Sequence, residues 1–168
     1  MCSGTPPSER PARGPSLSVL LLLLVAAAPA FAEAPRRICS VSLAGDELLA
    51  LLVPTERVVC VSSLVDDPVM SNAAGHFGDT IPRLGARIEP VLSQRPDLVV
   101  AAPWNRGGFL QLLERASVRT LVLEPVVGFD DIRREVLRLG RATGAEQRAA
   151  EAVARLDARL AEIDRRVG

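Results

Sequence analysis

The chain has 168 residues, of which 48% are hydrophobic and 24% charged, and its formal net charge at pH 7 is zero. All 20 basic residues are arginine, and 20 acidic residues balance them. Binding to nucleic acid or to an anionic membrane surface requires a basic surplus, so the composition argues against both partners. The length allows one domain with a hydrophobic core.

The first 32 residues have the layout of a secretory signal peptide. Arg10 and Arg13 form a basic segment, residues 17–28 are apolar, and residues 30–32 are a small-residue cleavage pattern. The apolar stretch is shorter than the roughly 20 residues of a membrane-spanning helix. Cys39 is not placed as a lipoprotein cysteine would be. We predict cleavage after residue 32 and a soluble exported protein that does not span the membrane.

Short apolar runs then alternate with helical patterns. Strands or brief extended segments are predicted at 37–43, 58–61, 81–85, 98–102 and 120–123. Helices are predicted at 47–53, with Asp46 as its cap, and at 89–94, 109–114, 130–143 and 145–167. Such alternation implies parallel strands with right-handed crossovers. The expected fold class is α/β, a parallel-sheet three-layer lobe followed by a long helix.

The run 98–102 is apolar on both faces and ends at Pro103, directly before Trp104, the only tryptophan of the sequence. A strand of this kind is typical of the inside of a parallel sheet. Ligands of open α/β sheets bind beyond the carboxyl ends of the strands, which makes Trp104 a candidate ligand contact. The alternative is a tryptophan packed beneath a loop.

Small and polar side chains follow the predicted strands and would line the same edge of the sheet. The candidate ligand contacts are Ser42, Ser62, Ser63, Trp104, Asn105 and Arg106. Small residues let a bulky ligand approach the backbone, while tryptophan and arginine offer flat surfaces for stacking. This row of side chains favours a shallow binding face over an enzyme pocket.

Asp66, His76 and the long segment 68–80 that contains His76 are further candidates for contact with a ligand. Asp66 belongs to an acidic pair that either contacts a ligand, a metal or a partner or forms a solvated turn. Residues 68–80 lack periodicity, and a loop of this length is usually functional or mobile. With one histidine and no glycine-rich phosphate loop after a strand, the sequence predicts no catalytic site, resident metal or cofactor.

Cys39 and Cys60 both lie in predicted strands, and two interpretations of them remain open. An even pair in an oxidising compartment favours a disulfide. Two small buried thiols are the alternative, because bridging neighbouring parallel strands usually strains the link.

Five segments carry a resemblance to a known family: residues 37–42, 57–62, 81–85, 89–99 and 139–144. In order and spacing they resemble the periplasmic substrate-binding proteins of ABC importers for iron-siderophores, haem and cobalamin, the class with a rigid helical backbone. The run Trp104-Asn105-Arg106-Gly107-Gly108 is similar to the loop that places a tryptophan against the ligand in cobalamin-binding members.

The resemblance implies two α/β lobes joined by one long helix, with the ligand between the lobes. Residues 33–143 then correspond to the first lobe and residues 144–168 to the start of the inter-lobe helix, and the second lobe is absent. Members commonly present a glutamate from each lobe to the permease, a role that we do not assign to Glu114.

The function that the resemblance implies is capture of a ferric siderophore, haem or cobalamin in the periplasm and delivery to an ABC importer permease. Two alternatives remain open: a small exported α/β enzyme or thiol redox protein using Cys39 or Cys60, and a gene fragment without independent function. The mid-strand positions of both cysteines argue against the thiol enzyme. The sequence does not specify which chelate is bound.

Overall fold

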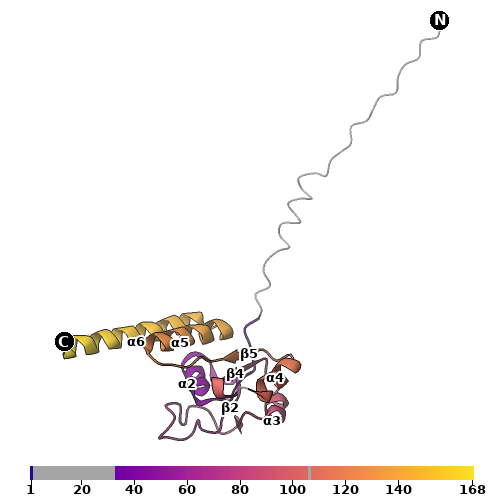
Figure 1. Ribbon diagram of the computed structural model, residues 1–168, viewed down its shortest axis with the longest axis horizontal. Coiled ribbons are helices and arrows are strands. Elements are labelled where there is room, and N and C mark those ends of the chain that lie inside the picture. The colour runs from indigo at the N-terminus through magenta and orange to yellow at the C-terminus, as the bar shows by residue number, and fades with distance from the viewer. Residues whose placement is uncertain (2–32, 106) are drawn as a thin grey trace. The chain divides into compact units, whose positions relative to one another are not determined.

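The computed structural model describes residues 1, 33–105 and 107–168. The predicted signal peptide, apart from Met1, therefore lies outside the described residues, and so does Arg106. Residues Ala34–Gly168 form one unit around a five-stranded sheet with the strand order β3-β2-β1-β4-β5 (Figure 1). All neighbouring strands are parallel. The strands are β1 (Ile38–Ser40), β2 (Val58–Ser62), β3 (Arg83–Leu84), β4 (Leu98–Ala101) and β5 (Thr120–Val122).

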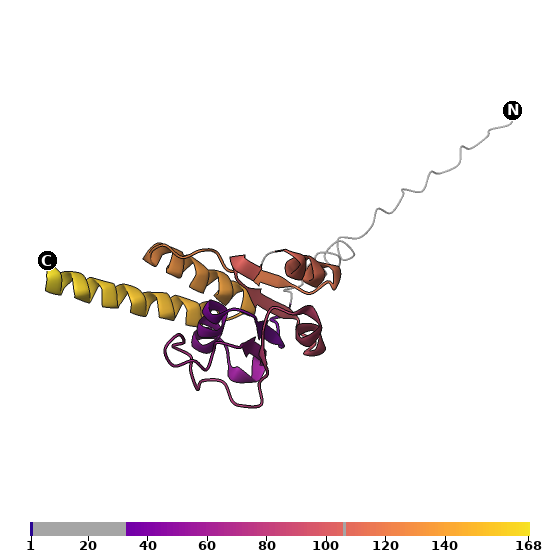
Figure 2. The same ribbon diagram turned by 60° about the horizontal axis from the view of Figure 1, so that its bottom comes forward.

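Helices cover both faces of this sheet (Figure 2). The α-helices are α2 (Leu43–Leu52), α3 (Ile88–Ser93), α4 (Gly108–Arg115), α5 (Phe129–Thr143) and α6 (Glu146–Val167). Short 3-10 turns at Thr55–Arg57 and Pro103–Asn105 complete the elements. Apolar side chains of α2, α5 and α6 pack on one face, and those of α3 and α4 pack on the other. The predicted α/β fold with a parallel sheet in three layers is therefore confirmed.

The central strand β4 shows how the two helical layers share the sheet. Leu98 and Val100 belong to the core cluster with α2, α5 and α6, whereas Val99 and Ala101 belong to the cluster with α3 and α4. All four are completely buried. Successive strand residues point to opposite faces, so an apolar run is required where both faces are covered. Each buried valine or leucine contributes about 1.5–3 kcal/mol of transfer free energy.

The first helix begins earlier than predicted. The strand predicted at 37–43 ends at Ser40, and α2 starts at Leu43 with Ser42 as its N-cap. The Ser42 hydroxyl accepts a hydrogen bond from the Gly45 N–H at 3.2 Å, which satisfies a backbone donor of the first turn. Asp46, predicted as the cap, is instead a buried residue within the helix.

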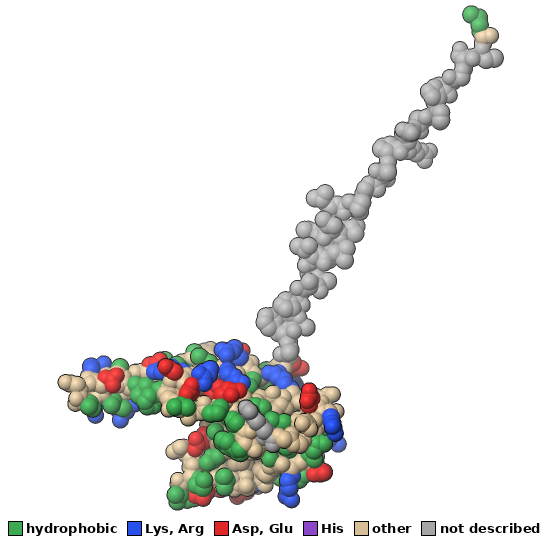
Figure 3. All heavy atoms as spheres, viewed as in Figure 1, with side chains coloured by type: hydrophobic (Ala, Val, Ile, Leu, Met, Phe, Trp, Pro, Cys, Tyr) green, Lys and Arg blue, Asp and Glu red, His purple; other side chains and the backbone are tan. Residues whose placement is uncertain are grey.

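The last two helices meet at a close contact between Gly140 and Ala149. A Cβ atom on Gly140 would lie 2.5 Å from the Ala149 Cβ, so only glycine permits this approach. Arg133 on α5 also pairs with Asp157 on α6, with 2.6 Å between Nη2 and Oδ1. Figure 3 shows the charged side chains of both signs mixed along these helices. Beyond this contact Ile163 and Val167 of α6 are exposed. In the described part of the chain, no helix is both long and apolar enough to cross a membrane.

The structure decides the open question of the cysteines, because Cys39 and Cys60 are joined by a disulfide. An irregularity in the β1–β2 register brings the two residues opposite each other, with 4.6 Å between their Cα atoms. That separation is within the usual range for disulfides. Both residues are completely buried in the core cluster with α3 and α4.

Reduction of this disulfide should lower the free energy of unfolding by about 3 kcal/mol, the entropic value for a cross-link across a sequence separation of 21 residues. Urea unfolding of the oxidised and the fully reduced protein measures the difference. The variant Cys39→Ala/Cys60→Ala is the control and should not respond to reductant. Equal midpoints for the oxidised and reduced protein would contradict a stabilising disulfide.

Candidate functional site

The site is built at the edge of the sheet where the parallel strands end. We call this the carboxyl edge and define it by the described residues that follow the strands: 41–43, 63–82, 102–105, 107 and 123–128. Because β1, β2, β4 and β5 run in the same direction, the beginnings of these segments lie on the same side of the sheet. The sheet faces are covered by helices, so this edge is where the strands can present side chains to a ligand.

Trp104 is raised into solvent by a short turn at the end of β4. The side-chain oxygen of Asn105 accepts a hydrogen bond from the Ala102 N–H at 2.8 Å, and the Asn105 N–H donates to the Ala102 carbonyl at 2.9 Å. Gly107, with φ of 101°, then turns the chain into α4 in a conformation that favours glycine. Trp104 is 72% exposed as a result, so it is not packed beneath a loop.

The predicted neighbours of Trp104 have different surroundings. Asn105 is half-buried and uses its carbonyl oxygen to hold the turn. Arg106 lies outside the described residues. Ser63 is exposed directly after β2. Within this group the structure therefore presents Trp104 and Ser63 to solvent.

Ser42 and Ser62, also predicted as ligand contacts, are buried and use their hydroxyls within the protein. Ser42 is 3% exposed and caps α2, as described above. The Ser62 hydroxyl donates to an Asp46 carboxylate oxygen at 2.5 Å, and the Ser62 N–H lies 3.1 and 3.2 Å from the two carboxylate oxygens. The hydroxyls of these two serines therefore hold the backbone at the carboxyl edge, and both side chains are too buried to offer a ligand much surface.

Asp46 joins the first turn of α2 to the end of β2 and was missed as a site residue. It is 0% exposed, and burial raises the pKa of its carboxyl above the ordinary value of 3.8, while the hydrogen bonds from Ser62 and Ser40 offset part of that shift. An acidic residue in the first turn of a helix was visible in the sequence, but its partner Ser62 lies 16 residues away. Only the packing of α2 on β2 brings the two together.

The long segment 63–82 is anchored by two side chains. Arg83 donates to both carboxylate oxygens of Asp66, at 2.7 and 3.0 Å, and this bidentate pair holds the pKa of the Asp66 carboxyl below its usual range. Glu47 on α2 accepts from the backbone N–H of Asn72 at 2.8 Å and from its side-chain amide at 3.1 Å. Asp66, predicted as a ligand contact, is thus the partner of Arg83, a residue that the sequence did not single out for a site.

A buried carboxylate also holds the segment that follows β5. Glu135 on α5 accepts from the Glu124 N–H at 3.1 Å and from Arg138 at 2.8 Å. Arg138 in turn donates to the Val122 carbonyl at 3.2 Å. The exit of β5 is thereby fixed to the middle of α5.

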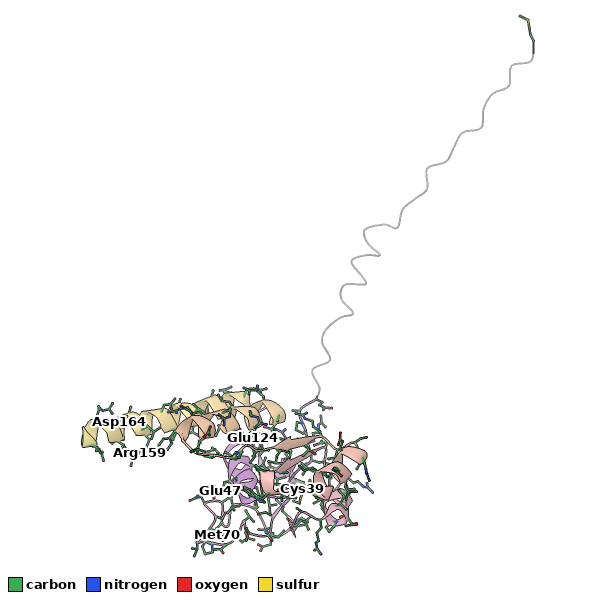
Figure 4. All side chains as sticks on the ribbon, viewed as in Figure 1. Cys39, Glu47, Met70, Glu124, Arg159 and Asp164 are labelled. Carbon is green, nitrogen blue, oxygen red and sulfur yellow. A yellow bond between two sulfur atoms is a disulfide. The ribbon has the colours of Figure 1, made fainter. Side chains whose placement is uncertain are left out.

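Large apolar side chains are exposed in three of these regions. We call the following set the apolar rim: Val69, Met70, Trp104, Val126, Val127 and Phe129, each more than half exposed. Figure 4 shows Met70 at the outer part of the 63–82 segment and Glu124 at the start of the segment after β5. The rim residues lie after β2, β4 and β5, or begin α5.

His76 is exposed beside a groove of about 340 Å³ that Glu47, Asn72 and Leu51 also line. Its ring contacts Phe77 edge-on, with 5.0 Å between ring centroids. In residues 33–105 and 107–168 there is no group of three or more histidine, cysteine or acidic residues placed to hold a metal ion.

A second hollow, of about 570 Å³, lies between the end of α2 and the start of α6. It is lined by Arg57 and Arg148, whose guanidiniums donate to backbone carbonyls of Thr143 and Leu52 respectively. These arginines join segments of the fold, and the hollow lies away from the segments that form the carboxyl edge. We assign the candidate site to the carboxyl edge.

Ionisation of Asp46 should make the folded state less stable as the pH rises. Because the pKa is raised in the folded state, the unfolded chain loses this proton first, and the free energy of unfolding falls as the pH increases above 3.8. Asp46→Asn cannot ionise and should lose this component. Urea unfolding between about pH 4 and 7 should show the parent protein losing stability relative to Asp46→Asn.

Ser63→Ala changes an exposed neighbour without removing a titratable group and serves as the control. Its stability relative to the parent should not vary with pH. A parent protein that gains stability relative to Asp46→Asn as the pH rises would contradict the raised pKa.

Comparison with known proteins places this geometry in a known fold. No protein-family model and no curated protein matches the sequence. Among solved structures, a possible iron-binding periplasmic solute-binding protein of Staphylococcus epidermidis matches with a TM-score of 0.67 and 22% identity, covering 81% of this chain and 53% of that one. A periplasmic haem-binding protein of Pseudomonas aeruginosa matches with a TM-score of 0.61 and 26% identity, covering 76% and 45%.

A periplasmic vitamin B12-binding protein of Vibrio cholerae also matches, with a TM-score of 0.57 and 20% identity, covering 76% of this chain and 49% of that one. The chain thus spans about half the length of these three proteins. An ABC transporter substrate-binding protein of Listeria monocytogenes is a further structural neighbour. The predicted resemblance is confirmed: the chain has the fold of the periplasmic solute-binding proteins of ABC importers, over about half of their length.

Proposed function

We propose that this protein is an exported solute-binding protein that captures a metal chelate or corrinoid, namely a ferric siderophore, haem or cobalamin, and delivers it to the permease of an ABC importer. The observation that carries the proposal is the 72% exposed Trp104 at the carboxyl end of β4. It stands where ligands of open α/β sheets bind, on a fold whose solved examples include iron-, haem- and vitamin B12-binding proteins.

The segments after β2, β4 and β5 each expose apolar side chains, which suits a ligand with an extended apolar surface. The indole ring supplies a flat face, and the other members of the apolar rim add aliphatic and aromatic surface after β2 and β5. The turn that carries Trp104 is closed by the Asn105–Ala102 hydrogen bonds. A turn that is already formed loses little conformational entropy on binding, which favours affinity.

The alternative of an exported thiol enzyme has little support. Cys39 and Cys60 are bonded to each other and completely buried, so neither offers an accessible thiolate for catalysis. The structural neighbours reported above are binding proteins. In keeping with the predicted signal peptide and these neighbours, we propose the periplasm as the location of the protein.

Titration with cyanocobalamin, haemin and a ferric tris-hydroxamate tests the proposal. Because Trp104 is the only tryptophan, its fluorescence reports on this turn alone. We expect at least one of these ligands to quench the emission saturably and to bind in calorimetry. Truncation of a central aromatic contact costs about 1–2 kcal/mol or more, so Trp104→Ala should weaken binding by roughly tenfold or more.

Leu112→Ala is the matched control, because it removes an exposed apolar side chain from α4, outside the carboxyl edge. It should leave calorimetric affinity unchanged. N-acetyltryptophanamide corrects for light absorption by the coloured ligands. Lack of binding by folded protein to all three ligands would overturn the proposed function, and equal affinity of Trp104→Ala and the parent would remove Trp104 from the site.

A further inference from the structure

One guanidinium group fixes the long segment between β2 and β3. In addition to its bidentate pair with Asp66, Arg83 donates to the Ile81 carbonyl at 2.6 Å, the Gly78 carbonyl at 2.8 Å and the Phe77 carbonyl at 2.9 Å. Its three nitrogens thus make five hydrogen bonds, which matches the number of N–H donors in the side chain.

These contacts close the segment on itself. Asp66 lies near its beginning, and Phe77, Gly78 and Ile81 lie near its end, so Arg83 ties the two ends together across about 15 residues. Lysine could not replace it, because an ammonium has three donors and no planar fork for a carboxylate. The Glu47–Asn72 contact then fixes the middle of the segment to α2.

Arg83, which closes this segment, lies at the same edge of the sheet as the candidate site. Arg83 pairs with Val61, and Leu84 pairs with Ser62, so the two-residue strand β3 lies alongside the last residues of β2. The Arg83 backbone is therefore at the carboxyl edge, although β3 comes after the long segment in the sequence. The segment that it closes carries Val69 and Met70 of the apolar rim.

We propose that Arg83 is a positioning residue for ligand binding: together with Asp66 it holds residues 63–82 in the arrangement that receives the ligand at the carboxyl edge. This inference rests on the proposed function and adds a role that requires no contact between Arg83 and the ligand. A segment that is already ordered before the ligand binds loses little conformational entropy when the ligand binds. The apparent affinity is proportional to the fraction of molecules in which the segment is ordered.

The first measurement is hydrogen exchange of the ligand-free protein, which does not depend on any ligand. The amides of Ser71, His76 and Ile81 are hydrogen-bonded within the segment. In Arg83→Gln, peptides covering residues 63–82 should exchange roughly tenfold faster or more, while those of α5 and α6 stay unchanged. Arg83→Lys should lie between Arg83→Gln and the parent.

The second measurement is the rate of binding of cyanocobalamin, haemin and a ferric tris-hydroxamate, followed by Trp104 fluorescence. If the segment is ordered one tenth of the time, Kd rises about tenfold through a slower association rate, with little change in the dissociation rate. A general loss of stability would also speed exchange in α5 and α6, so unchanged exchange there separates local disorder from global unfolding. Arg115→Gln, at an exposed position at the end of α4, is the control and should behave as the parent.

Asp66→Asn serves as a second variant, because it retains the three carbonyl contacts of Arg83 and is the milder change. Unchanged exchange in residues 63–82 of both variants would overturn the inference. Faster exchange with an unchanged Kd would also overturn it, while leaving the proposed function intact. Absence of binding by the parent to all three probes would instead overturn the proposed function, and the inference with it.

Discussion

The burial of both faces of the parallel sheet is the constraint on which the rest of the structure depends. Leu98, Val99, Val100 and Ala101 alternate between two helical layers and are all completely buried. A strand covered on both faces has no side chain free for a ligand, and its backbone N–H and C=O groups are hydrogen-bonded to the neighbouring strands. Ligand binding is therefore expected at the segments that follow the carboxyl ends of the strands.

Each of these segments is held by a polar side chain that reaches back to the fold. Asn105 holds the turn after β4, Asp46 holds the end of β2, and Glu135 holds the exit of β5. Arg83 closes the longest segment. All four bind backbone groups of these segments or strand ends, and unpaired backbone groups are costly when buried. The carboxyl edge is thus held to the fold by these contacts, and Trp104 is exposed on it.

Hydrophobic periodicity predicted most of the elements, because it reflects which faces are buried, and burial is the largest favourable contribution to folding. It predicted β4, the long α6 and the parallel three-layer arrangement. It placed the start of α2 too late, because Ser42 and Asp46 are both acceptable caps and the choice depends on which side chain is free. The Asp46 carboxylate accepts a hydrogen bond from Ser62, 16 residues further on, and Ser42 therefore caps the helix.

The sequence by itself determined the order of the elements and the place of Trp104 directly after an inner strand, since both follow from local patterns of apolar residues and prolines. Only the tertiary structure decided that Cys39 faces Cys60, that Ser42 and Ser62 serve the fold, and that Asp66 belongs to Arg83. Each of these depends on strand register or on contacts between residues distant in the chain. A register shift of one residue exchanges the two faces of a strand, and an apolar run buried on both faces does not distinguish the two registers.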